Sequence, residues 1–188
     1  VVLSALSGTT NALVEIGETI SKGDRQAARK AIDKLETHYR AFIKDLVKKE
    51  QAVAKANSII AEHFEFLNII LKISFSEALS KDMLAQGELL STKLFCVYLE
   101  EQGISHQLLP ALEFMSIDHY DEPQIGSIKV KLSQLLKAHK SKKIFVTQGY
   151  ICRNARGEVD NLKRGGSDYS ASLIAAAINA SVCEIWTD

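Results

Sequence analysis

Short apolar runs typical of buried strands alternate along this chain with amphipathic helical patterns, and this alternation constrains the fold most strongly. Helical stretches connect the strand-like runs, which we expect at 1–6, 108–109, 142–147 and 182–186. Strands that are joined through helices pair in parallel, and the helices pack on both faces of the sheet. The sequence therefore predicts an α/β fold, a three-layer αβα sandwich with a mainly parallel sheet.

The longest helical pattern covers residues 25–71 and contains two helices, which follow a break at Gly23. A third helix is expected directly afterwards, with Ser80 as its N-cap. Because the helical pair separates the first strand from the second, we predict an inserted helical subdomain at about 24–73. Such an insertion can serve as a lid or as a contact with another subunit.

The composition favours one globular domain, or one domain with an insertion, since 46% of the 188 residues are hydrophobic. Lys and Arg total 23, and Asp and Glu also total 23, so no net charge draws the chain to nucleic acid or to a membrane surface. Cys96, Cys152 and Cys183 form no C-x-x-C pair, which favours reduced thiols and a cytoplasmic location. The histidines have no partner at metal-ligand spacing, so no metal-ligating residue is predicted.

The stretch at 161–170 reads N-L-K-R-G-G-S-D-Y-S and places an arginine directly before two glycines, a hydroxyl and a carboxylate. Gly165 and Gly166 allow a sharp turn and a close approach of the backbone to a ligand. The guanidinium of Arg164 and the free amides at the start of the next helix favour a carboxylate or a phosphate. Judged from these residues alone, an anion-binding loop and an ordinary strand-to-helix loop with an exposed arginine weigh about equally.

Side-chain caps are expected at the two helices that follow small polar loops. Ser167 or Asp168 is expected to cap the helix after the double glycine, so that Asp168 is either a cap or a site group. The loop at 7–11 can hold an oxyanion through its amides, but it lacks the G-K-[ST] ending of a P-loop, which excludes that motif. For this second loop, a capping role of Thr9 or Thr10 is the favoured interpretation.

Glu88 lies beside the apolar stripe of the third helix, and not opposite it. A carboxylate at such a position needs a partner or a cationic ligand, because leaving a buried charge unpaired costs about 3 to 5 kcal/mol. The other interpretation is an edge position that reaches solvent, which is favoured when the residue is considered alone.

Five ordered motifs resemble the catalytic domain of aspartokinase, in the amino acid kinase superfamily: V-V-L-S-A-L-S-G-T-T-N, Q-G-E-L-L-S, T-Q-G-Y-I, L-K-R-G-G-S-D-Y-S-A and E-I-W-T-D. The resemblance spans the whole chain. It implies transfer of the ATP γ-phosphoryl group to the side-chain carboxylate of L-aspartate, giving 4-phospho-L-aspartate for lysine, threonine and methionine synthesis. It also implies that Mg²⁺ accompanies the nucleotide and that the full-length protein is a homo-oligomer.

The resemblance assigns a role to each candidate residue. The aspartate-binding residues are expected to be Thr10, Glu88, Arg164, Gly165, Gly166 and Ser167. Arg164 would grip the α-carboxylate and Glu88 would pair with the α-ammonium, while Thr10 and the loop amides would position the nucleophilic carboxylate. Asp168 would organise the catalytic cations, and Thr187 with Asp188 would begin the nucleotide site.

Parts of the family pattern do not occur in this sequence. The K-F-G-G-T-S motif of the first strand, the nucleotide-binding segments after W-T-D and the regulatory ACT domains are all missing. We therefore expect a fragment, truncated at both ends, that does not turn over by itself. The alternative from another class is a non-catalytic amino-acid-binding or interaction module of the same fold.

Overall fold

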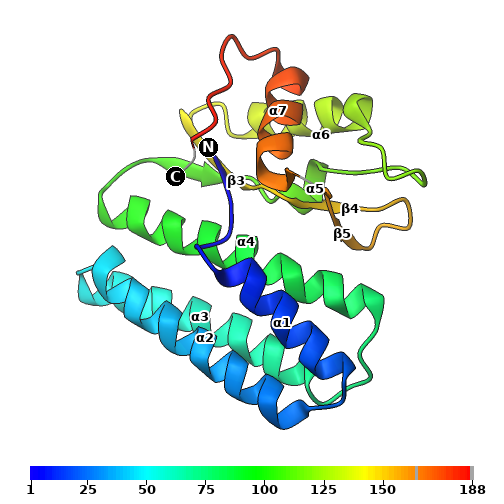
Figure 1. Cartoon of the computed structure of the whole chain (residues 1–188). Helices are drawn as coiled ribbons and strands as arrows, with labels where there is room; N and C mark the ends of the chain where they lie inside the picture. Colours follow the sequence, from blue (N-terminus) through cyan, green and yellow to red (C-terminus); the bar gives the residue numbers. More distant parts are fainter. Residues whose placement is uncertain (164, 187–188) are drawn as a thin grey trace. The chain divides into compact units, whose positions relative to one another are not determined.

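The computed structural model describes residues 1–163 and 165–186 of the chain (Figure 1). These residues divide into two compact units, of which one comprises Val1–Ser4 with Ser105–Asp188 and the other comprises Ala5–Ile104. The helical insertion predicted at about 24–73 lies inside the second unit, and its boundaries as a separate subdomain stay a prediction. Each unit has its own secondary structure and is described separately below.

The unit at 5–104 is built from four helices, which are α1 (Thr9–Ser21), α2 (Arg25–Leu46), α3 (Glu50–Ile70) and α4 (Glu77–Glu101). Helix α1 packs against α2 and α4, and α3 packs against the same two neighbours, so the four helices enclose one core. The fully buried side chains at its centre are Leu13, Ile16, Ile32, Tyr39, Ile43, Ile60, Phe64 and Leu94. Each buried aliphatic or aromatic side chain of this kind stabilises the fold by about 1.5 to 3 kcal/mol.

Local sequence signals set the ends of these helices. Gly23 has a φ of 83°, and its amide and that of Asp24 bond back to the carbonyls of Ile20 and Thr19, which ends α1 in a Schellman motif. The Asp24 side chain then accepts a hydrogen bond of 2.9 Å from the Ala27 amide and caps α2. The predicted break at Gly23 is therefore confirmed.

The unit formed by 1–4 and 105–188 holds the sheet. Its three strands are β1 (Val2–Leu3), β2 (His106–Leu108) and β3 (Ile144–Gln148), and they pair in parallel in the order β1-β3-β2. Val2 lies opposite Thr147, and Leu108 lies opposite Val146. The α/β class with a mainly parallel sheet is thus confirmed.

Helices and a hairpin complete this unit, namely α5 (Ala111–Phe114), α6 (Ile125–Ala138), β4 (Ile151–Arg153), β5 (Val159–Asn161) and α7 (Gly166–Ile178). Helices α6 and α7 pack against each other on one face of the sheet, as Figure 1 shows, and an apolar cavity of about 280 Å³ remains between these helices and the strands. Strands β4 and β5 pair antiparallel and form a hairpin. The hairpin leads the chain directly to the start of α7, where Gly165 and Gly166 form what is here called the glycine loop.

Two predicted elements differ from the structure. Residues 182–186 form no strand, and Val182 and Trp186 are 68% and 88% exposed, because none of the described strands lies beside them to complete a ladder. The third helix begins at Glu77 and not after Ser80, since the hydroxyl of Ser76 already accepts the Leu79 amide at 3.3 Å.

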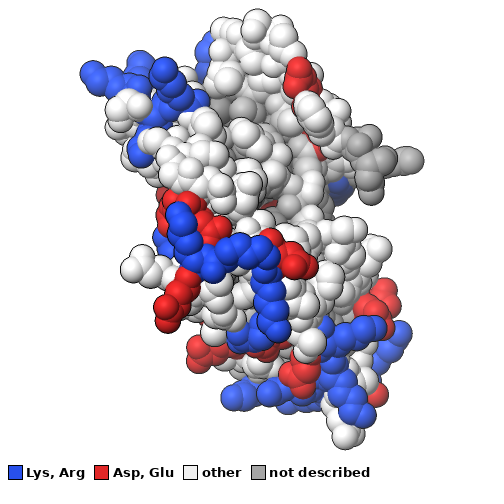
Figure 2. All heavy atoms as spheres, turned by 90° about the vertical axis from the view of Figure 1, so that its left-hand side faces the viewer, with Lys and Arg blue, Asp and Glu red and all other residues white. Residues whose placement is uncertain are grey.

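Charges of both signs alternate on the helical surface in Figure 2, as expected from equal numbers of acidic and basic residues. Many of them form i,i+4 pairs along a helix, such as Arg29 with Asp33 and Arg40 with Glu36. Such exposed pairs contribute only a few tenths of a kcal/mol each. Within the part of the chain that the structure describes, no helix has both the length and the apolar character that a membrane crossing needs.

Candidate functional site

Helix α7 begins at a glycine, and this start differs from the predicted one. The N-cap is Gly165, with φ 77° and ψ 17°, and no side chain caps the helix. The prediction that Ser167 or Asp168 is the cap is wrong, because both residues already lie in the first turn. A left-handed conformation costs a residue with a Cβ roughly 1 kcal/mol or more, whereas glycine adopts it freely.

The glycine loop rests on the turn after β3. A Cβ atom on Gly149 would meet Cβ and Oγ of Ser167 at 2.6 Å, and a Cβ atom on Gly166 would overlap the ring of Tyr150. Tyr150 itself has a φ of 61°, and its amide donates to Oγ of Ser170 at 2.9 Å. These contacts fix the start of α7 against the end of β3.

The first turn of α7 carries amides that have no bond to another described residue. Among the described residues, the hydrogen bonds within α7 begin with the Tyr169 amide, which donates to the Gly165 carbonyl at 2.7 Å. The amides of Gly166, Ser167 and Asp168 precede it and lie at the positive end of the helix dipole. Backbone amides in this arrangement bind carboxylates and phosphates. The side chain of Asp168 is exposed beside them.

Helix α1 begins in the same way. Its N-cap is Gly8, with φ 78° and ψ −13°, and no side chain caps it, so the favoured interpretation of Thr9 or Thr10 as a cap is wrong. Thr10 is half-buried in the first turn, and the Thr9 amide bonds to the Leu6 carbonyl at 2.9 Å. Because the Thr9 amide is already bonded, the first turn of α1 differs from that of α7, and among the described residues it leaves the amides of Thr10 and Asn11 for a ligand.

Glu88 is buried in the helical unit with only 3% of its surface exposed, so the alternative of a solvent-reaching edge position is wrong. Its Oε1 accepts a long hydrogen bond of 3.4 Å from the Ala5 amide, while Oε2 is buried and has no partner among the described residues. Burial raises the pKa of Glu88 to about 7, although hydrogen bonds from its own backbone and from Ala5 oppose this shift. A cation placed against Oε2 would satisfy the carboxylate.

The predicted site residues divide between the two units. Thr10 and Glu88 belong to the unit at 5–104, whereas Gly165, Gly166, Ser167 and Asp168 belong to the sheet unit. Arg164, Thr187 and Asp188, which carry the guanidinium and the expected start of the nucleotide site, lie outside the described residues. Among the residues with a described structure, no group of three or more His, Cys, Asp or Glu side chains is arranged to hold a metal ion.

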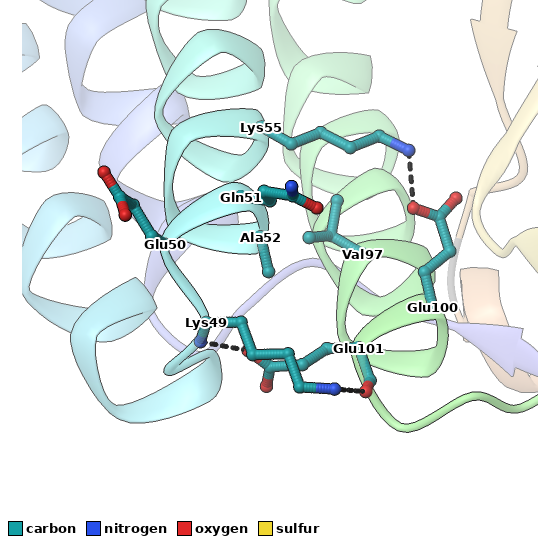
Figure 3. Close-up of a pocket in the computed structure, with 8 residues that line it drawn as sticks. All are labelled: Lys49, Glu50, Gln51, Ala52, Lys55, Val97, Glu100 and Glu101. Atoms are coloured by element: carbon teal, nitrogen blue, oxygen red, sulfur yellow. Dashed lines mark hydrogen bonds and ion pairs between the residues drawn. The ribbon is translucent and has the colours of Figure 1, made fainter.

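A cavity of about 560 Å³ lies elsewhere, between the start of α3 and the end of α4 (Figure 3). Both lysines of its lining and the carboxylates of Glu100 and Glu101 already have partners. Lys55 pairs with Glu100 at 2.6 Å, and the Glu101 carboxylate accepts the amides of Lys48 and Lys49 at 2.8 and 2.5 Å. None of the predicted site residues lines this cavity.

Two tyrosines beside the candidate residues were not found by sequence reasoning. The ring of Tyr150 packs against Gly166. The sequence indicates this residue only as the aromatic position directly after Gly149 in the motif T-Q-G-Y-I. Tyr39 reaches the start of α1, with its hydroxyl 2.8 Å from Oγ1 of Thr9. In the sequence Tyr39 reads only as one more apolar position of a helix, so no local signal distinguishes it.

Comparisons with known proteins show the family of this chain. The sequence model of the amino acid kinase family matches residues 1–188. Bifunctional aspartokinase/homoserine dehydrogenase 2 of Escherichia coli is 33% identical over 189 residues, which cover 100% of this chain and 23% of that protein. Lysine-sensitive aspartokinase 3 of the same organism is 31% identical over 191 residues, covering 100% of this chain and 42% of the relative.

Solved structures show the same likeness. The chain superimposes on E. coli aspartokinase III in complex with aspartate and ADP with a TM-score of 0.82 and 29% identity, covering 100% of this chain and 42% of that one. Aspartate kinase of Clostridium acetobutylicum gives a TM-score of 0.72 at 19% identity, covering 98% of this chain and 39% of that one, and shows the fold alone. The chain spans less than half the length of these relatives. It belongs to the amino acid kinase family, and its relatives named here are aspartokinases.

Proposed function

We propose that this chain is the part of an aspartate kinase that binds L-aspartate and presents its side-chain carboxylate to ATP. The observation that carries the proposal is Glu88, whose buried Oε2 has no partner among the described residues. The α-ammonium of an amino acid is a cation of the right size for it. Two structures of E. coli aspartokinase III are complexes with aspartate, which supports aspartate as the ligand.

Each candidate residue has a place in this proposal. Glu88 pairs with the α-ammonium, and Arg164 grips the α-carboxylate in bidentate fashion. The amides of Gly165, Gly166 and Ser167 add hydrogen bonds to a carboxylate, and Thr10 orients the carboxylate that reacts. Each of these helix starts, taken in its own unit, favours an anionic group, because its amides and its dipole are positive there.

The reaction proposed is a direct transfer. An oxygen of the aspartate side chain forms a bond to the γ-phosphorus, the bond from that phosphorus to the β-γ bridging oxygen breaks, and ADP leaves with the electron pair. No protein nucleophile is needed, since phosphoryl transfer is accelerated mainly by positioning and charge neutralisation.

The nucleotide half of the site is proposed from the resemblance. Thr187 and Asp188 begin the ATP site, and Asp168 organises the cations there. Its exposed carboxylate is an oxygen ligand of the kind that Mg²⁺ prefers, and Mg²⁺ bound with the nucleotide supplies charge neutralisation of the phosphates. A cytoplasmic homo-oligomer that serves lysine, threonine and methionine synthesis is part of the same proposal.

Calorimetric titration with L-aspartate tests this function. The wild-type chain is expected to bind, while Glu88→Gln, which keeps the shape but removes the charge, weakens binding by about 10-fold or more, as expected for a lost charge-assisted hydrogen bond. Glu65→Gln, an exposed carboxylate in the same unit, is the matched control. Equal affinity of the Glu88 and Glu65 variants would contradict the assignment, and ATP-dependent turnover by the chain alone would contradict the expectation that it is inactive by itself.

A further inference from the structure

The segment at residues 5–9, here called the 5–9 loop, is held from two sides inside the helical unit. It connects β1 to α1 and ends in the left-handed Gly8 and the buried Thr9, directly before Thr10. Its conformation therefore decides where Thr10 and the first-turn amides of α1 lie.

Helix α4 holds the loop on one side. Gly87 packs so closely that a Cβ atom there would meet Cβ of Ala5 at 2.9 Å and Cγ2 of Thr9 at 3.3 Å. The next residue, Glu88, accepts the Ala5 amide. The loop and the carboxylate proposed to bind the ligand ammonium are thus in direct contact.

Helix α2 holds the loop on the other side through Tyr39, which is completely buried. The phenolic oxygen lies 2.8 Å from Oγ1 of Thr9, and both hydroxyls are in the core. The ring packs edge-on against Phe64 with centroids 6.0 Å apart, so the hydroxyl is aimed at the loop by a rigid aromatic pair.

The hydroxyl of Tyr39 is not needed for packing. A phenylalanine ring would fill the same space, and burying a hydroxyl is unfavourable unless it is hydrogen-bonded. What the hydroxyl adds is a hydrogen bond to Thr9, the residue that directly follows the left-handed Gly8. Without it, the loop would populate additional conformations, and affinity falls with the fraction of molecules in the competent one.

We propose that Tyr39 is a positioning residue for the amino-acid half of the site: through its bond to Thr9 it holds the 5–9 loop in the conformation that presents Thr10 and the α1 amides beside Glu88. This inference rests on the proposed function, which supplies the ligand. Tyr39 touches no ligand in this account and acts only through the loop. The helical insertion thereby sets the affinity for the amino acid.

The test uses two measurements on the same variants. Hydrogen exchange of the Ala5 and Thr9 amides reports the order of the loop, and titration with L-aspartate reports affinity. Tyr39→Phe is expected to speed exchange at both amides about 5-fold and to raise the dissociation constant by about the same factor, which is the effect of one lost hydrogen bond. Exchange of the Ile60 amide in the core of α3 reports global opening, so acceleration at Ala5 and Thr9 by another factor than at Ile60 separates loop ordering from general destabilisation.

Matched variants isolate the bond. Thr9→Val removes the same bond from the other side and is expected to behave as Tyr39→Phe does, with no further loss in the double variant. Thr9→Ser keeps the hydroxyl, so amide exchange and aspartate affinity are both expected to stay at their wild-type values. Tyr98→Phe makes the same chemical change on α4, outside the loop, and is expected to alter neither measurement.

The outcomes are distinguishable. Unchanged exchange in Tyr39→Phe and Thr9→Val, or unchanged affinity in a chain that binds aspartate, overturns the proposal. A wild-type chain that binds no aspartate overturns the proposed function instead, while the exchange data still decide whether Tyr39 orders the loop. Should Tyr39→Phe unfold the helical unit, Thr9→Val tests the same bond from the loop side.

Discussion

Gly166 lies against Tyr150 so closely that a Cβ atom on the glycine would overlap the aromatic ring. The ring cannot easily withdraw, because the Tyr150 backbone is held by bonds from its amide to Ser170 and from the Leu162 amide to its carbonyl. The second glycine of R-G-G-S is therefore required by packing, whereas Gly165 is required by its backbone conformation.

Replacing Gly166 by alanine is expected to destabilise the chain by about 1 to 3 kcal/mol, the usual cost of overpacking. Gly126, in the first turn of α6, is the matched control, since a Cβ atom there would have no neighbour within 4 Å and its φ is not positive. There, alanine is expected to leave the free energy of unfolding unchanged or raise it by up to about 1 kcal/mol. Urea unfolding of both variants checks this, and equal effects would refute the packing argument.

Glu88 is expected to make folding less favourable at alkaline pH. Its pKa is about 7 in the folded chain and 4.5 when unperturbed, so the folded state binds its proton more tightly. The resulting stabilisation is complete below about pH 4.5 and is lost as the pH rises through 7. Glu88→Gln should therefore be more stable than wild type at pH 8, by on the order of 3 kcal/mol, and this difference should vanish near pH 4.5. Unfolding curves at both pH values measure it, with Glu65→Gln as control.

The contribution of His63 to stability is expected to depend on pH in the opposite sense to that of Glu88. Burial, aided by Lys93, lowers its pKa from 6.5 to about 4, and its Nδ1 lies 2.7 Å from Oε1 of Gln86. The unfolded chain binds this proton more readily, so the contribution to stability is complete above pH 6.5 and is lost as the pH falls towards 4. Compared with His63→Gln, the wild type should lose on the order of 3 kcal/mol over that interval. His38→Gln, which makes the same change at an exposed position of α2, is the matched control.

Binding of aspartate should release a proton from Glu88 at mildly acidic pH. A carboxyl with a pKa of about 7 is mostly protonated at pH 6, and a ligand ammonium favours the ionised form. Calorimetry at pH 6 in buffers of different ionisation enthalpy should therefore show release of nearly one proton, and at pH 8 almost none. The same result in Glu88→Gln would assign the proton to another group.

Local signals predicted the parts of the fold that local interactions determine. The helical periods at 25–71 gave α2 and α3 correctly, and the break at Gly23 was visible because glycine ends a helix by itself. Strand formation depends on a neighbour, and for this reason the apolar run at 182–186 was assigned wrongly. Both cap predictions failed for one reason, namely that Gly8 and Gly165 occupy the cap positions, which were predicted for Thr9 or Thr10 and for Ser167 or Asp168.

For the candidate site, the sequence identified Glu88 as a carboxylate beside an apolar stripe, but only the structure shows that it is buried with one oxygen unpartnered among the described residues. The contact of Tyr39 with Thr9 joins residues that are 30 positions apart, and no pattern in either segment indicates it. The roles proposed for Thr10, Gly165 and Ser167 stay predictions that binding measurements have to test.

The bond between Tyr39 and Thr9 also limits how this chain can be redesigned. Helices α2 and α3 look like a module that could be exchanged for a short linker, because they leave and rejoin the chain within one helical unit. Yet α2 carries the phenol that anchors the turn before Thr10, well inside its length. On the proposed role of Tyr39, a shortened variant would therefore need a new buried hydroxyl or other hydrogen-bonding group at that point to keep its amino acid affinity, even if it folded well.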